Sequence, residues 1–147
     1  FDAIVFVGGP GAVEYWDDST AHKLLKDAIS SGKVAAGICS AAATLAKAGI
    51  LQGKRATVFP GDSQELIDNG ANYTAKHVEK DGLIITADGP NAARDFGEEI
   101  AKSIIQRRSL SRFVKCGKIL CDNFSTLSGI SPDQNLRSSN VKDNFKI

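Results

Sequence analysis

The chain has 147 residues, of which 42% are hydrophobic and 24% are charged, and these proportions are typical of one soluble domain with a single core. Its formal net charge of +1 conceals two unlike parts, which differ in the sign of their charge. The longest apolar runs fall short of the roughly 20 residues of a membrane-spanning helix, and the first residues lack the features of a secretion signal, so we expect a cytoplasmic protein with no membrane partner.

The first predicted strand covers residues 2–7, an unbroken apolar run that stops at Gly8-Gly9-Pro10-Gly11. A run without polar alternation is typical of a strand that is covered on both faces. A helix is predicted next, with Ser19 as its N-cap and Gly32 at its end. Its predicted inner face consists of Leu24, Leu25, Ala28 and Ile29.

A second apolar strand is predicted over residues 34–38, and a helix rich in small residues over 40–48, which places Cys39 at the junction between them. A third strand follows over 55–58, and a short helix over 62–69. Residues 77–79 and 83–86 flank the pair Asp81-Gly82, a strong signal for a β-hairpin.

The last predicted helix of the domain begins at Gly89-Pro90, because proline suits a first helical turn. Its predicted inner face consists of Ala93, Phe96, Ile100 and Ile104. Strands that alternate with helices predict an α/β fold with a mostly parallel sheet.

Beyond residue 106 the pattern changes. Residues 1–106 carry ten Lys or Arg and fourteen Asp or Glu, a net charge of −4, whereas 107–147 carry eight and three, a net charge of +5. We interpret 107–147 as an irregular, poorly ordered, Ser- and Asn-rich tail, in which only 113–120 has weak strand character. It lacks interleaved aromatic residues and a dense basic block, so we expect no nucleic-acid partner.

Cys39 is the main candidate for chemistry. Gly37-Ile38-Cys39-Ser40-Ala41 has the form small-x-nucleophile-x-small, the pattern of a nucleophile elbow. At the start of a helix, unpaired N–H groups and the helix dipole favour a thiolate. The amides of Ser40 and of Gly9 would then form an oxyanion hole. The alternative is a structural cysteine, because free cysteines are often buried in cores.

Several segments together resemble the ThiJ/PfpI superfamily: 2–9, 32–39, 46–57, 70–73, 81–86 and 89–90. The resemblance covers residues 1–106. It implies a flavodoxin-like sandwich, a homodimer or larger homo-oligomer, and a reactive Cys39. Activities of the family include glyoxalase and deglycase chemistry, intracellular peptidase activity, and redox-sensing or holdase roles.

The chain departs from the family pattern in three places. Family members begin with a further strand, helix and strand, so we expect a sheet that is incomplete at its N-terminal side, with an open edge beside the site. That missing part carries the family's acid/base glutamate. Ser40 and Phe59 stand where particular branches of the family have histidine, which disfavours proteolysis.

Other candidates carry weaker signals. By the resemblance, Glu14, Tyr15 and Trp16 line the pocket mouth or a dimer contact, although an exposed loop with one anchoring aromatic residue would explain them equally well. His77 is a weak acid/base candidate, and His22 a weaker one that suits an exposed helix position. We expect no metal, because the sequence lacks a repeated ligand spacing, and no nucleotide or other cofactor, because the glycine turn matches no nucleotide fingerprint.

We therefore predict a cysteine-dependent enzyme that acts on a small carbonyl compound or on a peptide or amide through Cys39. The first alternative is a redox sensor or holdase in which Cys39 is oxidised. The second alternative is an inactive fragment. Cys116 and Cys121 are interpreted as incidental thiols.

Overall fold

The computed structural model describes the backbone of residues 1–122 and the side-chain surroundings up to residue 110. Its first compact unit, residues 1–112, is built around a four-stranded sheet with the order β1 (Ala3–Val7), β2 (Val34–Ile38), β6 (Ile84–Ala87) and β5 (Val78–Asp81). The first three strands are mutually parallel, and β5 is antiparallel to β6. This is the mostly parallel α/β sheet that the sequence predicted.

Register brings three chain segments together at one edge of this sheet. Val7 pairs with Ile38, and Ile38 pairs with Ala87, so β1, β2 and β6 end side by side. The residues that follow them are Gly8, Cys39 and Asp88. In open parallel sheets, ligands bind at the carboxyl ends of the strands, so a binding site is expected at this edge.

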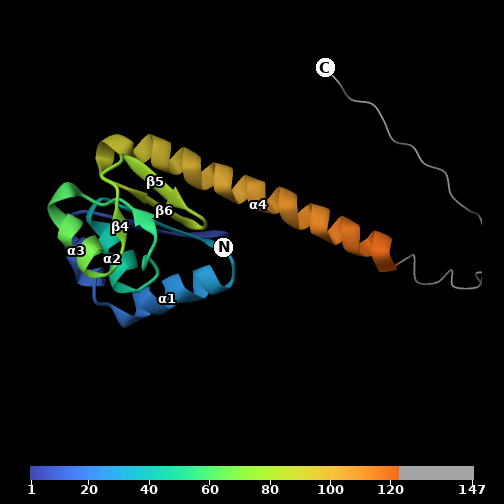
Figure 1. Ribbon diagram of the computed structural model, residues 1–147, viewed down its shortest axis with the longest axis horizontal. Helices are drawn as coiled ribbons and strands as arrows, with labels where there is room; N and C mark the ends of the chain where they lie inside the picture. The colour runs from blue at the N-terminus through green and yellow to red at the C-terminus, as the bar shows by residue number, and fades with distance from the viewer. Residues whose placement is uncertain (123–147) are drawn as a thin grey trace, which may run out of the picture. The chain divides into compact units, whose positions relative to one another are not determined.

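Helices lie on both sides of the sheet, as Figure 1 shows for α1 (Ser19–Ser30) and α4 (Ala93–Asp122). The shorter helices α2 (Ala42–Lys47) and α3 (Ser63–Asp68) pack against each other, and a small parallel sheet joins β3 (Arg55–Ala56) to β4 (Asn72–Tyr73). Four 3₁₀ turns complete the domain: η1 (Pro10–Tyr15), η2 (Cys39–Ala41), η3 (Pro60–Asp62) and η4 (Pro90–Ala92).

Alternate residues of β2 contribute to two different cores, as expected for a strand that is buried on both faces. Ala35 belongs to a core with Leu25 and Leu45, on the side of α1 and α2. Val34, Ala36 and Ile38 belong to a second core with Phe96 of α4. Strand β2 is therefore covered on both faces, by α1 and α2 on one side and by α4 on the other.

Strand β1 lies at the edge of the sheet with one neighbour, and one of its two faces is uncovered. Val5 is 42% exposed and Val7 is 75% exposed, so the expectation that this strand is covered on both faces was wrong. The open edge expected from the family resemblance is present. An apolar run alone does not reveal whether a strand has one neighbour or two.

The predictions for α1 were wrong in two details. Its N-cap is Asp18, whose side chain accepts a hydrogen bond of 2.6 Å from the Ala21 amide, rather than Ser19. Leu24 is 44% exposed, and the buried face of the helix is formed by Ala21, Leu25 and Ala28. Asp and Ser are both good N-caps, so the sequence did not distinguish the two positions.

Helix α4 also departs from the prediction, because it runs through residue 106 and ends at Asp122. The first sixteen residues assigned to an irregular tail are thus helical, and the weak strand expected over 113–120 was wrong. Residues 93–122 contain no proline and many good helix formers, which explains the continuation. Within the helix Ala93 is exposed, whereas Phe96 packs against the sheet as predicted, with Ile100 and Ile104 beside it. The predicted tail over 123–147 lies outside the described residues.

Candidate functional site

Cys39 lies where β2 gives way to η2 and α2, and its backbone is left-handed, with φ of 59°. Among the described residues only one other non-glycine residue, Ala75, has a positive φ. This conformation costs a residue with a Cβ atom roughly 1–2 kcal/mol, so the surrounding packing must enforce it. A strained residue on a sharp strand-to-helix turn is the geometry of a nucleophile elbow.

Two glycines make this tight turn possible. A Cβ atom on Gly8 would lie 2.7 Å from the Ile38 carbonyl oxygen and 2.8 Å from the Cβ of Cys39. A Cβ atom on Gly37 would lie 3.0 Å from the Cα of Ala42. The Gly8 amide also donates a 3.1 Å hydrogen bond to the Ile38 carbonyl. At both glycines, main-chain atoms of neighbouring segments therefore pack closely together, and no side chain fits at either position.

The half-buried Cys39 is shared by two hollows. The larger, of about 450 Å³, is almost entirely apolar and is lined by Val7, Gly8, Gly9, Ile38, Cys39, Pro90, Ala93 and Phe96. The smaller, of about 280 Å³, is lined by Gly9, Pro10, Val13, Cys39, Ser40 and Phe59. Gly9 borders both hollows and Ser40 borders one, so both predicted oxyanion-hole residues lie beside Cys39. The Sγ of Cys39 is 4.0 Å from the Ser40 hydroxyl.

The three residues after the glycine turn that were expected at the pocket mouth or a dimer contact have different surroundings. Glu14 is exposed, and Tyr15 is 54% exposed with its ring edge-on to Phe6 at a centroid distance of 6.3 Å. Neither side chain borders the hollows beside Cys39. Trp16, in contrast, donates a 2.9 Å hydrogen bond from its indole Nε1 to the Ser40 carbonyl.

The two histidines have separate positions. His22 Nε2 lies 2.7 Å from the Trp16 carbonyl oxygen, which can only accept, so this nitrogen is the donor and His22 anchors the loop. His77 Nδ1 lies 2.7 Å from a carboxylate oxygen of Asp88. This pair borders a third hollow, of about 190 Å³, which includes Phe59 and Pro90 but not Cys39. His77 therefore has an orienting partner but no demonstrated reach to the thiol.

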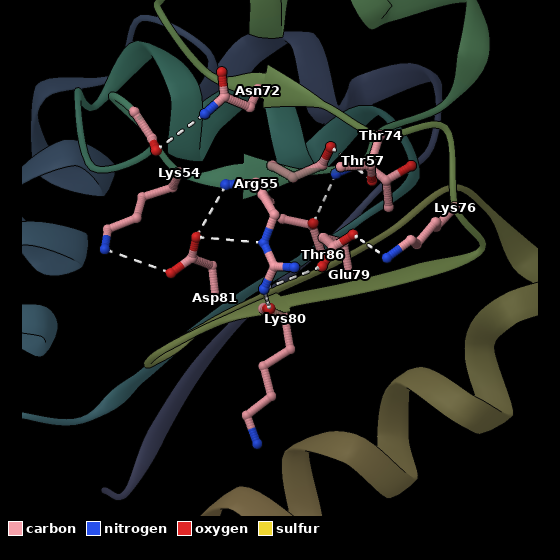
Figure 2. Close-up of polar contacts among 12 residues, drawn as sticks. Lys54, Arg55, Thr57, Asn72, Thr74, Lys76, Glu79, Lys80, Asp81 and Thr86 are labelled. Carbon is pink, nitrogen blue, oxygen red and sulfur yellow. Dashed lines mark hydrogen bonds and ion pairs between the residues drawn. The ribbon is translucent and has the colours of Figure 1, made fainter.

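A polar cluster holds β3 against the β5–β6 hairpin, as Figure 2 shows. We call it the polar seam and define it as Lys54, Arg55, Lys76, Glu79 and Asp81. Asp81 accepts a 3.1 Å hydrogen bond from the Arg55 amide and lies 3.4 Å from the Lys54 ammonium. Glu79 is 5% exposed and pairs with Lys76 at 3.0 Å and with Arg55 at 3.8 Å.

Both carboxyl groups of the polar seam are held in their charged form. Burial alone raises the pKa of Glu79, but hydrogen bonds from Lys76 and Thr74 and the charges of Lys76 and Arg55 outweigh burial and lower the pKa below its ordinary value. For Asp81, the hydrogen bond from the Arg55 amide lowers the pKa most, and the Lys54 charge adds to it. Neither residue borders the Cys39 hollows, so the seam is structural with respect to that site.

Sequence reasoning missed several residues of the site. Val7, Phe96 and Pro90 line the apolar hollow, and Phe59 lines the smaller one. Val7 and Phe59 each come at or after the carboxyl end of a strand, a signal that could have placed them near Cys39. Within the described residues, no group of three or more His, Cys, Asp and Glu side chains is arranged to hold a metal ion. In the same part of the chain, no helix is long and apolar enough to cross a membrane.

Comparison with known proteins agrees with this geometry. An uncharacterized protein of Methanocaldococcus jannaschii is 45% identical over 105 residues, which are 69% of this chain and 51% of that protein. Protein dj-1beta of Drosophila melanogaster is 34% identical over 116 residues, 78% of this chain and 62% of that protein. A deglycase of Pyrococcus abyssi is 30% identical over 102 residues, 69% of this chain and 61% of that protein. The chain thus spans about half to three fifths of the length of these relatives.

Solved structures give the same result. The crystal structure of a ThiJ/PfpI domain protein from Brachyspira murdochii superposes with a TM-score of 0.71 at 34% identity, over 72% of this chain and 61% of that one. The crystal structure of Drosophila DJ-1beta gives a TM-score of 0.66 at 37% identity, over 71% and 56%. The model of the DJ-1/PfpI family matches residues 1–103, most of the α/β unit. This chain belongs to the DJ-1/PfpI family.

Proposed function

We propose that this domain is a cysteine-dependent enzyme that acts on a carbonyl compound or an amide through Cys39. The observation that carries the proposal is the left-handed backbone of Cys39, which the contacts of Gly8 and Gly37 enforce. Strain of this kind persists where the surrounding structure over-determines it, and it clusters at functional sites. Relatives of this chain include proteins named deglycase and isonitrile hydratase.

In the proposed reaction the Cys39 thiolate adds its electron pair to the carbonyl carbon, and the π electrons of the C=O bond move to oxygen. The amides of Ser40 and Gly9 donate hydrogen bonds to that oxyanion. With a 2-oxoaldehyde such as methylglyoxal, protonation of the oxygen gives a hemithioacetal; its C1 proton then moves to C2 through an enediol, and water hydrolyses the resulting thioester to a 2-hydroxy acid and the free thiol. With an amide, the oxyanion collapses to a thioester, the amine leaves with a proton, and water then releases the acid and regenerates the thiol.

The proton for either route comes from water or from a group outside the two hollows. None of the side chains that border Cys39 in these hollows is an aspartate, glutamate, histidine or lysine. The apolar character of the larger hollow suits a small carbonyl compound better than a charged peptide.

The test compares turnover of methylglyoxal and of a chromogenic amide by the 147-residue chain and by its Cys39→Ala variant. Turnover that is lost in Cys39→Ala and kept in Cys116→Ser, a matched change of another cysteine, supports the proposal. Circular dichroism checks that each protein is folded. Full turnover by folded Cys39→Ala would contradict it.

A second candidate is a redox sensor, because the half-buried thiol lies beside two open hollows that admit a small oxidant. Two molecules of hydrogen peroxide would convert the thiol to the sulfinic acid and be reduced to two molecules of water. Peptide mass spectrometry after mild peroxide treatment distinguishes this role. Oxidation confined to Cys39 in a protein without turnover favours the sensor, whereas equal oxidation of Cys39, Cys116 and Cys121 counts against it.

A further inference from the structure

Trp16 is the only tryptophan of the chain, and its side chain reaches the turn that follows the nucleophile candidate. The indole N–H donates to the Ser40 carbonyl at 2.9 Å, across 24 positions of sequence. Trp16 follows η1 directly, and η1 has Gly9 as its N-cap. One side-chain hydrogen bond therefore fastens the segment that begins at Gly9 to the turn that contains Cys39 and Ser40.

Trp16 is itself held in place. His22 donates to its carbonyl oxygen at 2.7 Å, and the Lys47 ammonium lies 5.6 Å from the centroid of its ring. Lys47 also pairs with Asp17 at 3.5 Å and with Glu65 at 3.3 Å. Trp16 is thus held from α1 and α2: His22 fixes its main chain, and Lys47, itself paired with Glu65 of α3, lies over its indole ring.

The charge of Lys47 is secured in this arrangement. Burial alone lowers the pKa of Lys47, but the hydrogen bond from its ammonium to Glu65 and the charges of Glu65 and Asp17 outweigh burial and raise the pKa above its ordinary value. A cation that stays charged over an aromatic face is attracted to the ring. The support under Trp16 is therefore constant across the neutral pH range.

The strained turn at Cys39 needs a contact that keeps its backbone from relaxing. Cys39 has a backbone conformation that it would leave if the turn were free to relax, since the left-handed region is unfavourable for residues with a Cβ atom. Gly8 blocks relaxation on the β1 side through close backbone contact. On the outer side, the Trp16 hydrogen bond restrains the Ser40 carbonyl, and with it the orientation of the η2 amides.

We propose that Trp16 is a positioning residue for Cys39: its indole N–H, through the Ser40 carbonyl, keeps the elbow in the conformation that exposes the thiol to the η2 and Gly9 amides. The functional meaning of this inference rests on the proposed role of Cys39 as a nucleophile. The effect of Trp16 on the thiol can be tested without that role, because the reactivity of Cys39 can be measured without a substrate.

The experiment measures the second-order rate constant of carbamidomethylation by iodoacetamide, resolved for Cys39 by peptide mass spectrometry at neutral pH. Trp16→Phe keeps an aromatic ring over Lys47 but removes the N–H donor. We expect the rate constant at Cys39 to fall about fivefold or more, because one partly buried hydrogen bond is lost. Tyr73→Phe, which removes a polar hydrogen from a partly buried aromatic ring elsewhere, is the matched control and should leave the rate unchanged.

The stability of the variant separates positioning from a general structural role. A variant that merely loosens the fold loses cooperative thermal unfolding along with reactivity at Cys39, whereas loss of positioning lowers the rate in a protein whose thermal unfolding remains cooperative. An unchanged or faster rate in Trp16→Phe overturns the proposal. A slow rate at Cys39 in the unaltered protein, no faster than at Cys116, would instead overturn the proposed function.

A second readout uses the natural fluorescence of Trp16. The indole is hydrogen-bonded to the carbonyl of Ser40, the residue next to Cys39. Alkylation of Cys39 should therefore shift the fluorescence emission of the unaltered protein. The rate constant of this shift should equal the one that mass spectrometry gives. The same treatment of Cys39→Ala should leave the emission unchanged. Emission that stays constant while Cys39 is fully alkylated contradicts the proposed coupling.

Discussion

The elbow around Cys39 and the polar seam between β3 and the β5–β6 hairpin are stabilised in opposite ways. At the elbow, backbone atoms lie against backbone atoms, and Gly8 and Gly37 leave no room for a side chain. In the seam, long side chains reach across the gap, so that Asp81 contacts Arg55 and Lys54 (Figure 2). The elbow is specified by shape and the seam by charge.

This difference has a physical consequence for how each region responds to change. A contact between backbone atoms cannot relax by rotating a side chain, so one added methyl group displaces the main chain. An ion pair that is partly open to water weakens gradually, because solvent replaces the lost partner. We therefore expect the elbow to tolerate substitution poorly and the seam to tolerate it moderately.

The largest effect is expected for Gly8→Ala. The new Cβ atom would lie 2.7 Å from the Ile38 carbonyl oxygen and 2.9 Å from the Ser40 amide nitrogen, so backbone must move. We expect the free energy of unfolding, measured by urea denaturation, to fall by about 3 kcal/mol. Gly11→Ala, where the added atom meets no neighbour within 4 Å, is the matched control and should change stability little. Equal stability of the two variants would refute the close-contact account of the elbow.

The next largest effect is expected for Glu79→Gln in the polar seam. The variant keeps the shape of a side chain that is 4% exposed but removes the charge that faces Lys76 and Arg55. Since both cations remain accessible to water, we expect a loss of about 1.5 kcal/mol in the free energy of unfolding. For Glu98→Gln, whose side chain is 52% exposed and pairs with Arg94, a loss below about 0.5 kcal/mol is expected. If the two losses were the same, burial of Glu79 would not matter.

These two regions also differ in how far the sequence could predict them. The small residues around Cys39 lie close together along the chain, so the pattern of 37–41 predicted the elbow. The pair Asp81-Gly82 predicted the hairpin. The partners of the seam are distant, since Asp81 and the Arg55 amide are 26 positions apart. The Trp16 contact with Ser40 spans 24 positions, and neither contact carries a local signal.

Exposure and helix length were the other points that the pattern did not determine. The apolar run of β1 predicted a strand with two covered faces, but Val5 and Val7, which lie on one face, are exposed. Helix α4 continues to Asp122 because its charged residues are good helix formers, whereas the change in composition at residue 107 had suggested a boundary. A change in amino-acid composition therefore does not by itself mark the end of a helix.

A smaller effect sharpens the claim of strain at the elbow. Because φ of Cys39 is 59°, we expect Cys39→Gly to be more stable than Cys39→Ala by about 1 kcal/mol, the reverse of the order in ordinary helices and strands. Urea denaturation of both variants measures the difference. If the alanine variant were the more stable one, the left-handed backbone would not be a source of strain.

The smallest effect is expected in the acid response of the seam. Folding lowers the pKa of both Glu79 and Asp81, so each stabilises the folded state at neutral pH. That contribution is lost as the pH falls through the lowered folded-state pKa values. The urea midpoint of the unaltered protein should therefore decrease between pH 5 and pH 3 more steeply than that of a Glu79→Gln, Asp81→Asn double variant. Parallel profiles would show that other carboxyl groups dominate the acid response.

The most direct test concerns the thiol itself, because the reactivity of Cys39 is the central claim. Its carbamidomethylation rate by iodoacetamide is measured at neutral pH in the folded chain and in the same chain unfolded in urea, with correction for the effect of urea on a free cysteine. The elbow geometry predicts that folding makes this half-buried thiol faster, despite its reduced access to solvent. A Cys39 that reacts more slowly when the protein is folded would show that it is a structural core residue.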